Sequence, residues 1–172
     1  LDSWYQQHNA GKYDNNGHWA AQGKINQCLL HHLLQDDYFH LPAPKSTGRE
    51  IFHLNWLNNK LPPAAISAMD MQATLSALTA DSIANAIKTL TPKAHVYLCG
   101  GGIKNETLCA RIKEKLPNFI ISNTEQVGIN SDALEAMAFA WFAYAFDQQI
   151  SGNIPTVTGA YKATVLGTPY TP

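Results

Sequence analysis

Three consecutive glycines, Gly100, Gly101 and Gly102, are the residues of this chain that best suit a binding role. They end an apolar, β-branched and aromatic run, and a helix-like segment begins after them with Asn105 at about its cap position. Glycine allows a positive φ and lets a ligand approach the main chain closely. The helix that follows directs unpaired N–H groups and the positive end of its dipole to the same place, which suits a phosphate or a ribose hydroxyl. We therefore predict a nucleotide site at these four residues.

The glycine run by itself leaves a second interpretation open. It has neither the Gly-Lys-Ser/Thr ending of a Walker loop nor the glycine spacing of the dinucleotide fingerprint. Close packing of a helix against a sheet also selects glycine, so a tight turn without a ligand explains this stretch equally well.

A basic block at residues 45–50 is a second candidate site. It places two cations beside two hydroxyls and a glycine, and the planar donor fork of Arg49 suits a carboxylate or a phosphate. Thr47, Gly48 and Arg49 are its candidate contacts. The alternative is an exposed loop in which Arg49 pairs with a carboxylate such as Glu50.

Two carboxylates also stand out. Glu135 is almost the only charge in a long apolar segment that extends to Asp147. It could accept hydrogen bonds from hydroxyl groups of a ligand or, one turn into a helix, complement the helix dipole. Asp14 lies among turn residues and could bind a cation or a substrate, but local bonds to the backbone are the better explanation.

Length and composition limit the class of protein. The 172 residues are 45% hydrophobic and 15% charged, which fits one compact globular domain. A net charge of −1 gives no electrostatic case for nucleic acid or an anionic membrane. Cys28, Cys99 and Cys109 form no C-x-x-C pair, and the adjacent His31 and His32 point to different sides of a helix. We therefore expect a soluble, cytoplasmic protein with reduced, buried thiols and without a metal site.

A β-α-β unit surrounds the glycines. Residues 94–99 and 119–122 are predicted strands, and residues 105–115 are predicted to form the helix between them. Such a crossover implies parallel strands and a right-handed connection. Ligands bind such sheets beyond the carboxyl ends of the strands, which is where the glycines lie.

Apolar periodicity predicts further elements on both sides of this unit. Expected helices cover residues 2–9, 19–35, 52–61, two consecutive stretches within 64–90, and 133–145. Thr79 or Asp81 would cap the second of the consecutive helices, and Ser131 or Asp132 would cap the last. We expect an extended segment at residues 38–44, a short strand at 164–167 and a frayed end at 168–172.

Four blocks occur in a fixed order at residues 45–52, 99–102 with Asn105, 135–141 and 157–160. Together they resemble the C-terminal half of the anhydro-N-acetylmuramic acid kinases, a family of bacterial cell-wall recycling enzymes in the sugar kinase, Hsp70 and actin superfamily. The resemblance covers essentially all 172 residues. It implies an α/β fold, namely a ribonuclease H-like lobe of the actin-like ATPase superfamily with a mixed sheet flanked by helices.

The resemblance also implies a reaction. Members use ATP and Mg²⁺ to open the 1,6-anhydro ring of anhydro-N-acetylmuramic acid and to phosphorylate O6, giving N-acetylmuramic acid 6-phosphate in peptidoglycan recycling. By resemblance, Gly100, Gly101, Gly102 and Asn105 would contact the nucleotide and Glu135 the sugar.

One departure from the family is large. The Ser-Gly-Thr-Ser-type phosphate loop and the Asp-Thr-Gly-Pro-type motif with the catalytic aspartate are absent, and the latter is expected a few residues before Leu1. We therefore expect residues 1–172 to be a single C-terminal lobe without its N-terminal lobe, without a catalytic residue and inactive alone. The alternatives are a non-catalytic nucleotide- or sugar-binding module, or a lobe for homodimerisation through residues 139–146.

Overall fold

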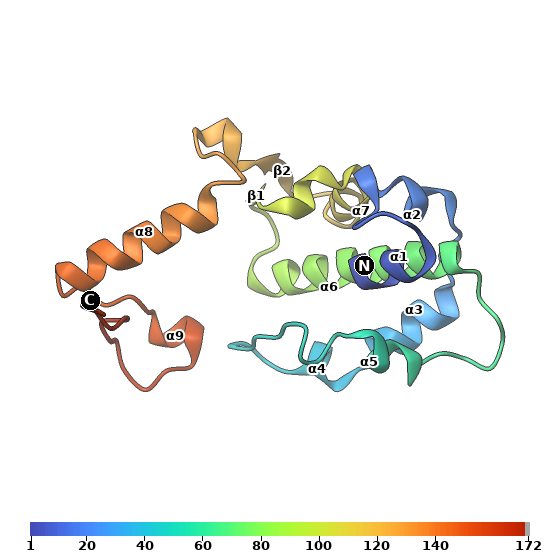
Figure 1. Ribbon diagram of the computed structural model, residues 1–172, viewed down its shortest axis with the longest axis horizontal. Coiled ribbons are helices and arrows are strands. Elements are labelled where there is room, and N and C mark those ends of the chain that lie inside the picture. Colours follow the sequence, from blue (N-terminus) through green and yellow to red (C-terminus); the bar gives the residue numbers. More distant parts are fainter. Residues whose placement is uncertain (171–172) are drawn as a thin grey trace.

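The computed structural model describes residues 1–170 as a mixed α/β arrangement around one long helix (Figure 1). The elements, in chain order, are α1 (Asp2–His8), η1 (Asn15–Gly17), α2 (His18–Gln22), α3 (Gln27–Leu34), α4 (Asp37–His40), α5 (Leu54–Asn58), α6 (Ala68–Leu90), β1 (His95–Leu98), η2 (Gly101–Lys104), α7 (Glu106–Lys115), β2 (Ile120–Asn123), η3 (Thr124–Val127), α8 (Leu134–Asp147) and α9 (Pro155–Thr158). None of the helices within residues 1–170 is long and apolar enough to span a membrane.

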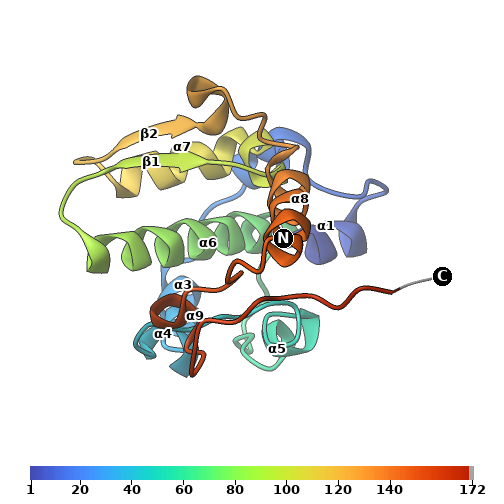
Figure 2. The same ribbon diagram turned by 90° about the vertical axis from the view of Figure 1, so that its left-hand side faces the viewer.

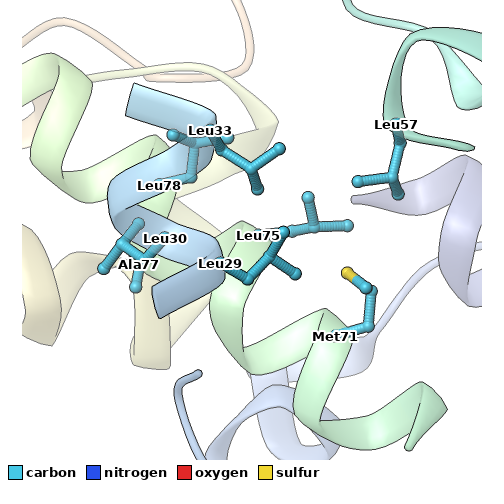
Figure 3. Packing of buried hydrophobic residues seen from close by; sticks show 8 residues of the cluster. All are labelled: Leu29, Leu30, Leu33, Leu57, Met71, Leu75, Ala77 and Leu78. Carbon is cyan, nitrogen blue, oxygen red and sulfur yellow. The ribbon is translucent and has the colours of Figure 1, made fainter. Parts of the chain in front are cut away.

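The central helix α6 separates two layers. Helix α7 and strands β1 and β2 lie on one side of it, and α3, α4 and α5 lie on the other (Figures 1 and 2). Each side has its own buried cluster. The first cluster joins α3, α5 and α6 through Leu29, Leu30, Leu33, Leu57, Met71, Leu75, Ala77 and Leu78 (Figure 3). The second joins α6 and α7 through Ala80, Ala84, Leu108, Ile112 and the adjacent Leu116.

The predicted β-α-β unit is confirmed. Strands β1 and β2 pair in parallel, with His95 opposite Ile120 and Leu98 opposite Asn123. Within the described residues the sheet has these two strands, and Ile121 packs toward the cluster of α6 and α7. The opposite face of the sheet is uncovered, since Ile120 is 63% exposed.

The predicted single helix over residues 19–35 is wrong, because the chain breaks at Gly23. This residue is extended and ends α2, and Asn26 then caps α3 by accepting a hydrogen bond from the N–H of Leu29 at 2.9 Å. A Cβ on Gly23 would overlap the carbonyl oxygen of Met69 on α6. The break is therefore set by close contact with a helix more than forty residues away.

The predicted division of residues 64–90 into two helices is also wrong. Helix α6 runs without interruption because neither Thr79 nor Asp81 acts as a cap. The hydroxyl of Thr79 donates to the carbonyl oxygen of Leu75 at 2.9 Å, inside the helix. Asp81 is buried and pairs with Lys115 of α7 at 2.7 Å. Residues 71–75 of α6 are buried, with Met71 only 2% exposed.

Three further predictions differ from the structure. Residues 37–40 form the short helix α4 instead of an extended segment, because the side chain of Asp36 accepts from the N–H of Tyr38. Residues 164–167 do not form a strand, and the predicted frayed end at 168–172 lies partly outside the described residues. Helix α8 is not capped by Ser131 or Asp132, because the side chain of Asn130 accepts from the N–H groups of Asp132 and Ala133.

Candidate functional site

The glycine turn, residues 100–104, lies at the carboxyl end of β1. Gly100 adopts φ +74 and ψ −174, a conformation that essentially only glycine reaches. Gly101 and Gly102 begin the helical turn η2, where backbone N–H groups have no partner inside the helix. A Cβ built on any of the three glycines would meet no atom of the protein within 4 Å.

Among the residues that the structure describes, this open space argues against packing as the reason for the glycines. Close packing of a helix on a sheet would place protein atoms beside the missing Cβ, and none is there. Gly100 is required by its positive φ, but Gly101 and Gly102 have no positive φ to explain them. The backbone of the turn is accessible to a ligand, which is the property that the nucleotide prediction needs.

Asn105 has a structural role that was predicted from its position. Its Oδ1 accepts from the N–H of Leu108 at 2.9 Å and caps α7. The side chain of Asn105 also lies against Gly17, and a Cβ on Gly17 would overlap it. The hydroxyl of Thr107 donates to the carbonyl oxygen of Gly17 at 2.9 Å. The capping role is confirmed, and contact with a nucleotide remains a prediction.

Asp14 belongs to the same region but makes only local bonds. Its two carboxylate oxygens accept from the N–H groups of Trp19 and Ala20, each at 2.9 Å, and the residue is 6% exposed. The structural interpretation of Asp14 is therefore confirmed. The described residues contain no group of three or more His, Cys, Asp or Glu side chains placed to hold a metal ion.

A pair of contacts that sequence reasoning missed links the glycine turn to the start of α8. The N–H of Gly100 donates to the carbonyl oxygen of Ser131 at 3.2 Å, and Nζ of Lys104 lies 2.8 Å from Oδ2 of Asp132. Hydrogen bonding to Asp132, together with its charge, raises the pKa of Lys104. Glu135 follows three residues later, exposed in the first turn of α8. The structure thus places Glu135 on an element that is anchored to the glycine turn.

The basic block lies on the other side of α6, apart from the glycine turn (Figure 1). Nζ of Lys45 donates to the carbonyl oxygens of Tyr38 and Phe39 at 2.9 and 3.1 Å. Lys45 and Thr47 are among the residues that line an apolar groove of about 880 Å³ between α6 and the segment from α4 to α5. Arg49 takes part in none of the ion pairs within residues 1–170, so the alternative in which Arg49 pairs with a carboxylate such as Glu50 is not seen there.

The three thiols are free, but the expectation that they are buried is wrong for two of them and only partly met by the third. Cys28 on α3 and Cys99 beside the glycine turn are exposed, and Cys109 on α7 is half-buried. Burial raises the pKa of the Cys109 thiol.

Comparison with known proteins identifies the family. A sequence model of the family "Anhydro-N-acetylmuramic acid kinase" matches residues 1–172. The chain belongs to the anhydro-N-acetylmuramic acid kinase family. It is 46% identical to a protein of that name from Photobacterium profundum, over 99% of this chain and 48% of the relative. It is 49% identical to one from Xylella fastidiosa, over 97% of this chain and 44% of the relative.

The resemblance drawn from four sequence blocks is therefore confirmed. A third family member, from Vibrio cholerae, is 42% identical over 100% of this chain and 47% of its own length. The chain spans about half the length of the curated anhydro-N-acetylmuramic acid kinases that it matches.

Proposed function

We propose that residues 1–172 form the C-terminal lobe of a two-lobed, cytoplasmic kinase that acts on anhydro-N-acetylmuramic acid. The observation that carries this proposal is the glycine turn, whose backbone is open at the carboxyl end of β1 and at the start of α7. Membership of the family supplies the chemistry that such a turn would serve. The lobe would have the ribonuclease H-like fold of the actin-like ATPases, completed by strands from the other half of the protein.

Two uncovered surfaces support a missing lobe. Parallel sheets are normally covered on both faces, and the outer face of β1 and β2 exposes Tyr97 by 38% and Ile120 by 63%. Helix α8 projects from the body (Figure 1), with Phe139 exposed by 70% and Tyr144 by 57%. Apolar surface of this kind marks a contact with another part of a protein. The same exposure favours the alternative of a dimerisation lobe.

In the proposed reaction, a water molecule adds to the anomeric carbon of the anhydro ring and gives a proton to the catalytic base. The bond between that carbon and O6 breaks, and O6 takes the γ-phosphoryl group of ATP, which leaves as ADP. The product is N-acetylmuramic acid 6-phosphate. Phosphoryl transfer depends mainly on positioning and charge stabilisation, and Mg²⁺ supplies charge neutralisation when bound with the phosphates. The catalytic base belongs to the motif expected upstream of Leu1, so we assign no catalytic residue within residues 1–172 and expect them to be inactive alone.

The glycine turn and Glu135 have separate roles in this proposal. Gly101 and Gly102 would present their N–H groups to the phosphates, and Gly100 and Asn105 would hold the turn in shape. Glu135 is exposed and would accept hydrogen bonds from sugar hydroxyls. The segment between α4 and α5, which holds the basic block, lies on the other side of α6 (Figure 1), so we assign it no contact with the nucleotide. Thr47, Gly48 and Arg49 would instead be possible contacts of a substrate carboxylate.

Calorimetric titration of magnesium-ADP tests the nucleotide site, with Gly101→Val as the decisive variant. A Cβ at Gly101 would meet no protein atom within 4 Å, so we expect the variant to fold, and its valine side chain would occupy the space that the ligand needs. We expect saturable binding that is lost in the variant while its thermal midpoint is retained.

Equal affinity in the wild type and in Gly101→Val would contradict the site. If residues 1–172 bind no nucleotide, the affinities of the wild type and of Gly101→Val are compared in a polypeptide of the family's full length. There, absence of ATP-dependent phosphorylation of anhydro-N-acetylmuramic acid would overturn the kinase proposal.

A further inference from the structure

The start of α8 depends on its attachment to the glycine turn. Helix α8 makes no extensive contact with any other helix or strand of the described residues. At its start, the N–H of Gly100 donates to Ser131, and Lys104 pairs with Asp132. These two contacts join the predicted nucleotide turn to the helix that carries Glu135.

The connecting loop, residues 130–133, can transmit a displacement because it is internally bonded. Oδ1 of Asn130 accepts from the N–H of Asp132 at 2.9 Å and from that of Ala133 at 3.1 Å. Ser131 is only 4% exposed, so its position is fixed by surrounding atoms. The N–H of Met137 donates to the carbonyl oxygen of Ala133 at 2.9 Å, which ties the loop to the first turn of α8.

Lys104 is placed to respond to a bound phosphate. It ends the η2 turn that begins with Gly101, and its side chain is 63% exposed. An ammonium group is a compact point charge that can interact with a phosphate and with a carboxylate on either side. Its position relative to Asp132 would therefore change when an anion occupies the turn.

We propose that Lys104 and Asp132 are positioning residues that couple the nucleotide turn to Glu135, so that bound nucleotide strengthens sugar binding. This inference rests on the proposed kinase function. Reciprocity requires that the sugar strengthens nucleotide binding by the same factor. Because the ion pair is exposed, its removal should change affinity by about two- to fivefold.

The test measures the affinity for anhydro-N-acetylmuramic acid with and without saturating magnesium-ADP, in the family-length polypeptide. We expect Lys104→Ala and Asp132→Asn each to bring the ratio of the two affinities close to one. In steady-state assays both should raise the KM for the sugar and leave kcat nearly unchanged. The charge reversal Lys104→Asp with Asp132→Lys should restore part of the coupling, which a general loss of stability would not do.

Two matched controls each remove a lysine or an aspartate charge outside the Lys104–Asp132 pair. Lys113→Ala changes an exposed lysine near the end of α7, and Asp147→Asn changes the last residue of α8. Both controls should retain the coupling, and added salt should reduce it in the wild type and in both controls, but not in Lys104→Ala or Asp132→Asn.

The outcomes separate the two proposals. A wild type that binds both ligands but keeps its coupling in Lys104→Ala and Asp132→Asn overturns the role of the ion pair and leaves the kinase proposal standing. If coupling is lost in Lys113→Ala and Asp147→Asn as it is in Lys104→Ala and Asp132→Asn, the role of the ion pair is also overturned. A wild type that binds neither ligand overturns the kinase function, and the inference with it.

Discussion

At the scale of single residues, Asp36 shows how one carboxylate joins several segments. Its oxygens accept from the indole N–H of Trp56 at 2.9 Å, the N–H of Tyr38 at 3.1 Å and the ammonium of Lys60 at 3.0 Å. Burial raises the pKa of Asp36, but these hydrogen bonds outweigh it and hold the pKa below its ordinary value. The ionised carboxylate therefore stabilises the wall of the apolar groove.

Asp36→Asn should lower the free energy of unfolding at pH 7 by about 1–2 kcal/mol, because charge-assisted hydrogen bonds are lost. The pKa of Asp36 is lower in the folded protein than in the unfolded chain. Its contribution is therefore complete above the unfolded pKa of about 4 and is lost as the pH falls through the folded value. Urea unfolding of the wild type and of Asp36→Asn from pH 7 to pH 3 should show that the difference between their free energies of unfolding becomes smaller. A difference that stays constant over this pH range would contradict the stabilising role of the ionised Asp36.

At the scale of elements, the local sequence and the packing partner compete to set helix ends. Helix α7 begins at a cap made by its neighbour Asn105, which is a local signal. Helix α2 ends at Gly23 because α6 passes so close that a side chain there would overlap Met69 and come within 2.9 Å of the Cβ of Ala73. The guanidinium of Arg111 on α7 reinforces this junction by donating to the carbonyl oxygens of Ala73 and Ala20.

Gly23→Ala should therefore separate α2 from α6 and lower the free energy of unfolding by about 1–3 kcal/mol. Gly102→Ala is the matched control, because its Cβ would meet no protein atom and its φ is not positive. Denaturant unfolding of both variants measures the difference. Equal stabilities would mean that the junction adapts to the added methyl group.

At the scale of the whole molecule, the described chain has two well-packed clusters, and the long helix α8 lies outside both. Both clusters share α6, so the layers on its two sides form one body. Helix α8 contributes Ala145 to the interior, but its apolar residues Met137, Phe139 and Trp141 are exposed. The chain covers about half of its relatives' length, and a surface like this one is the kind that the rest of a longer polypeptide would cover.

Phe139→Glu should leave the thermal midpoint of residues 1–172 almost unchanged, because Phe139 is 70% exposed, and should reduce self-association. In a family-length polypeptide whose other half covers α8, the same change should cost at least about 3 kcal/mol. Sedimentation velocity and thermal unfolding of both lengths measure these effects. Unchanged stability at the full length would contradict burial of α8.

Local patterns in the sequence determined the β-α-β unit, the glycine turn at its carboxyl end, the cap at Asn105 and the family. These features depend on neighbours within a few residues, where the period of apolar side chains, backbone freedom and capping chemistry decide the outcome. The local role of Asp14 could be predicted for the same reason.

Only the tertiary structure decided the break at Gly23, the continuity of α6, the exposure of α8 and the contact of Lys104 with Asp132. Each depends on groups far apart in the chain, such as Gly23 and Met69 or Asp81 and Lys115. Helix propensities differ by less than about 1 kcal/mol per residue, so one steric overlap or one buried ion pair outweighs them. The open space around the glycines likewise became evident only once the fold placed no atoms beside them.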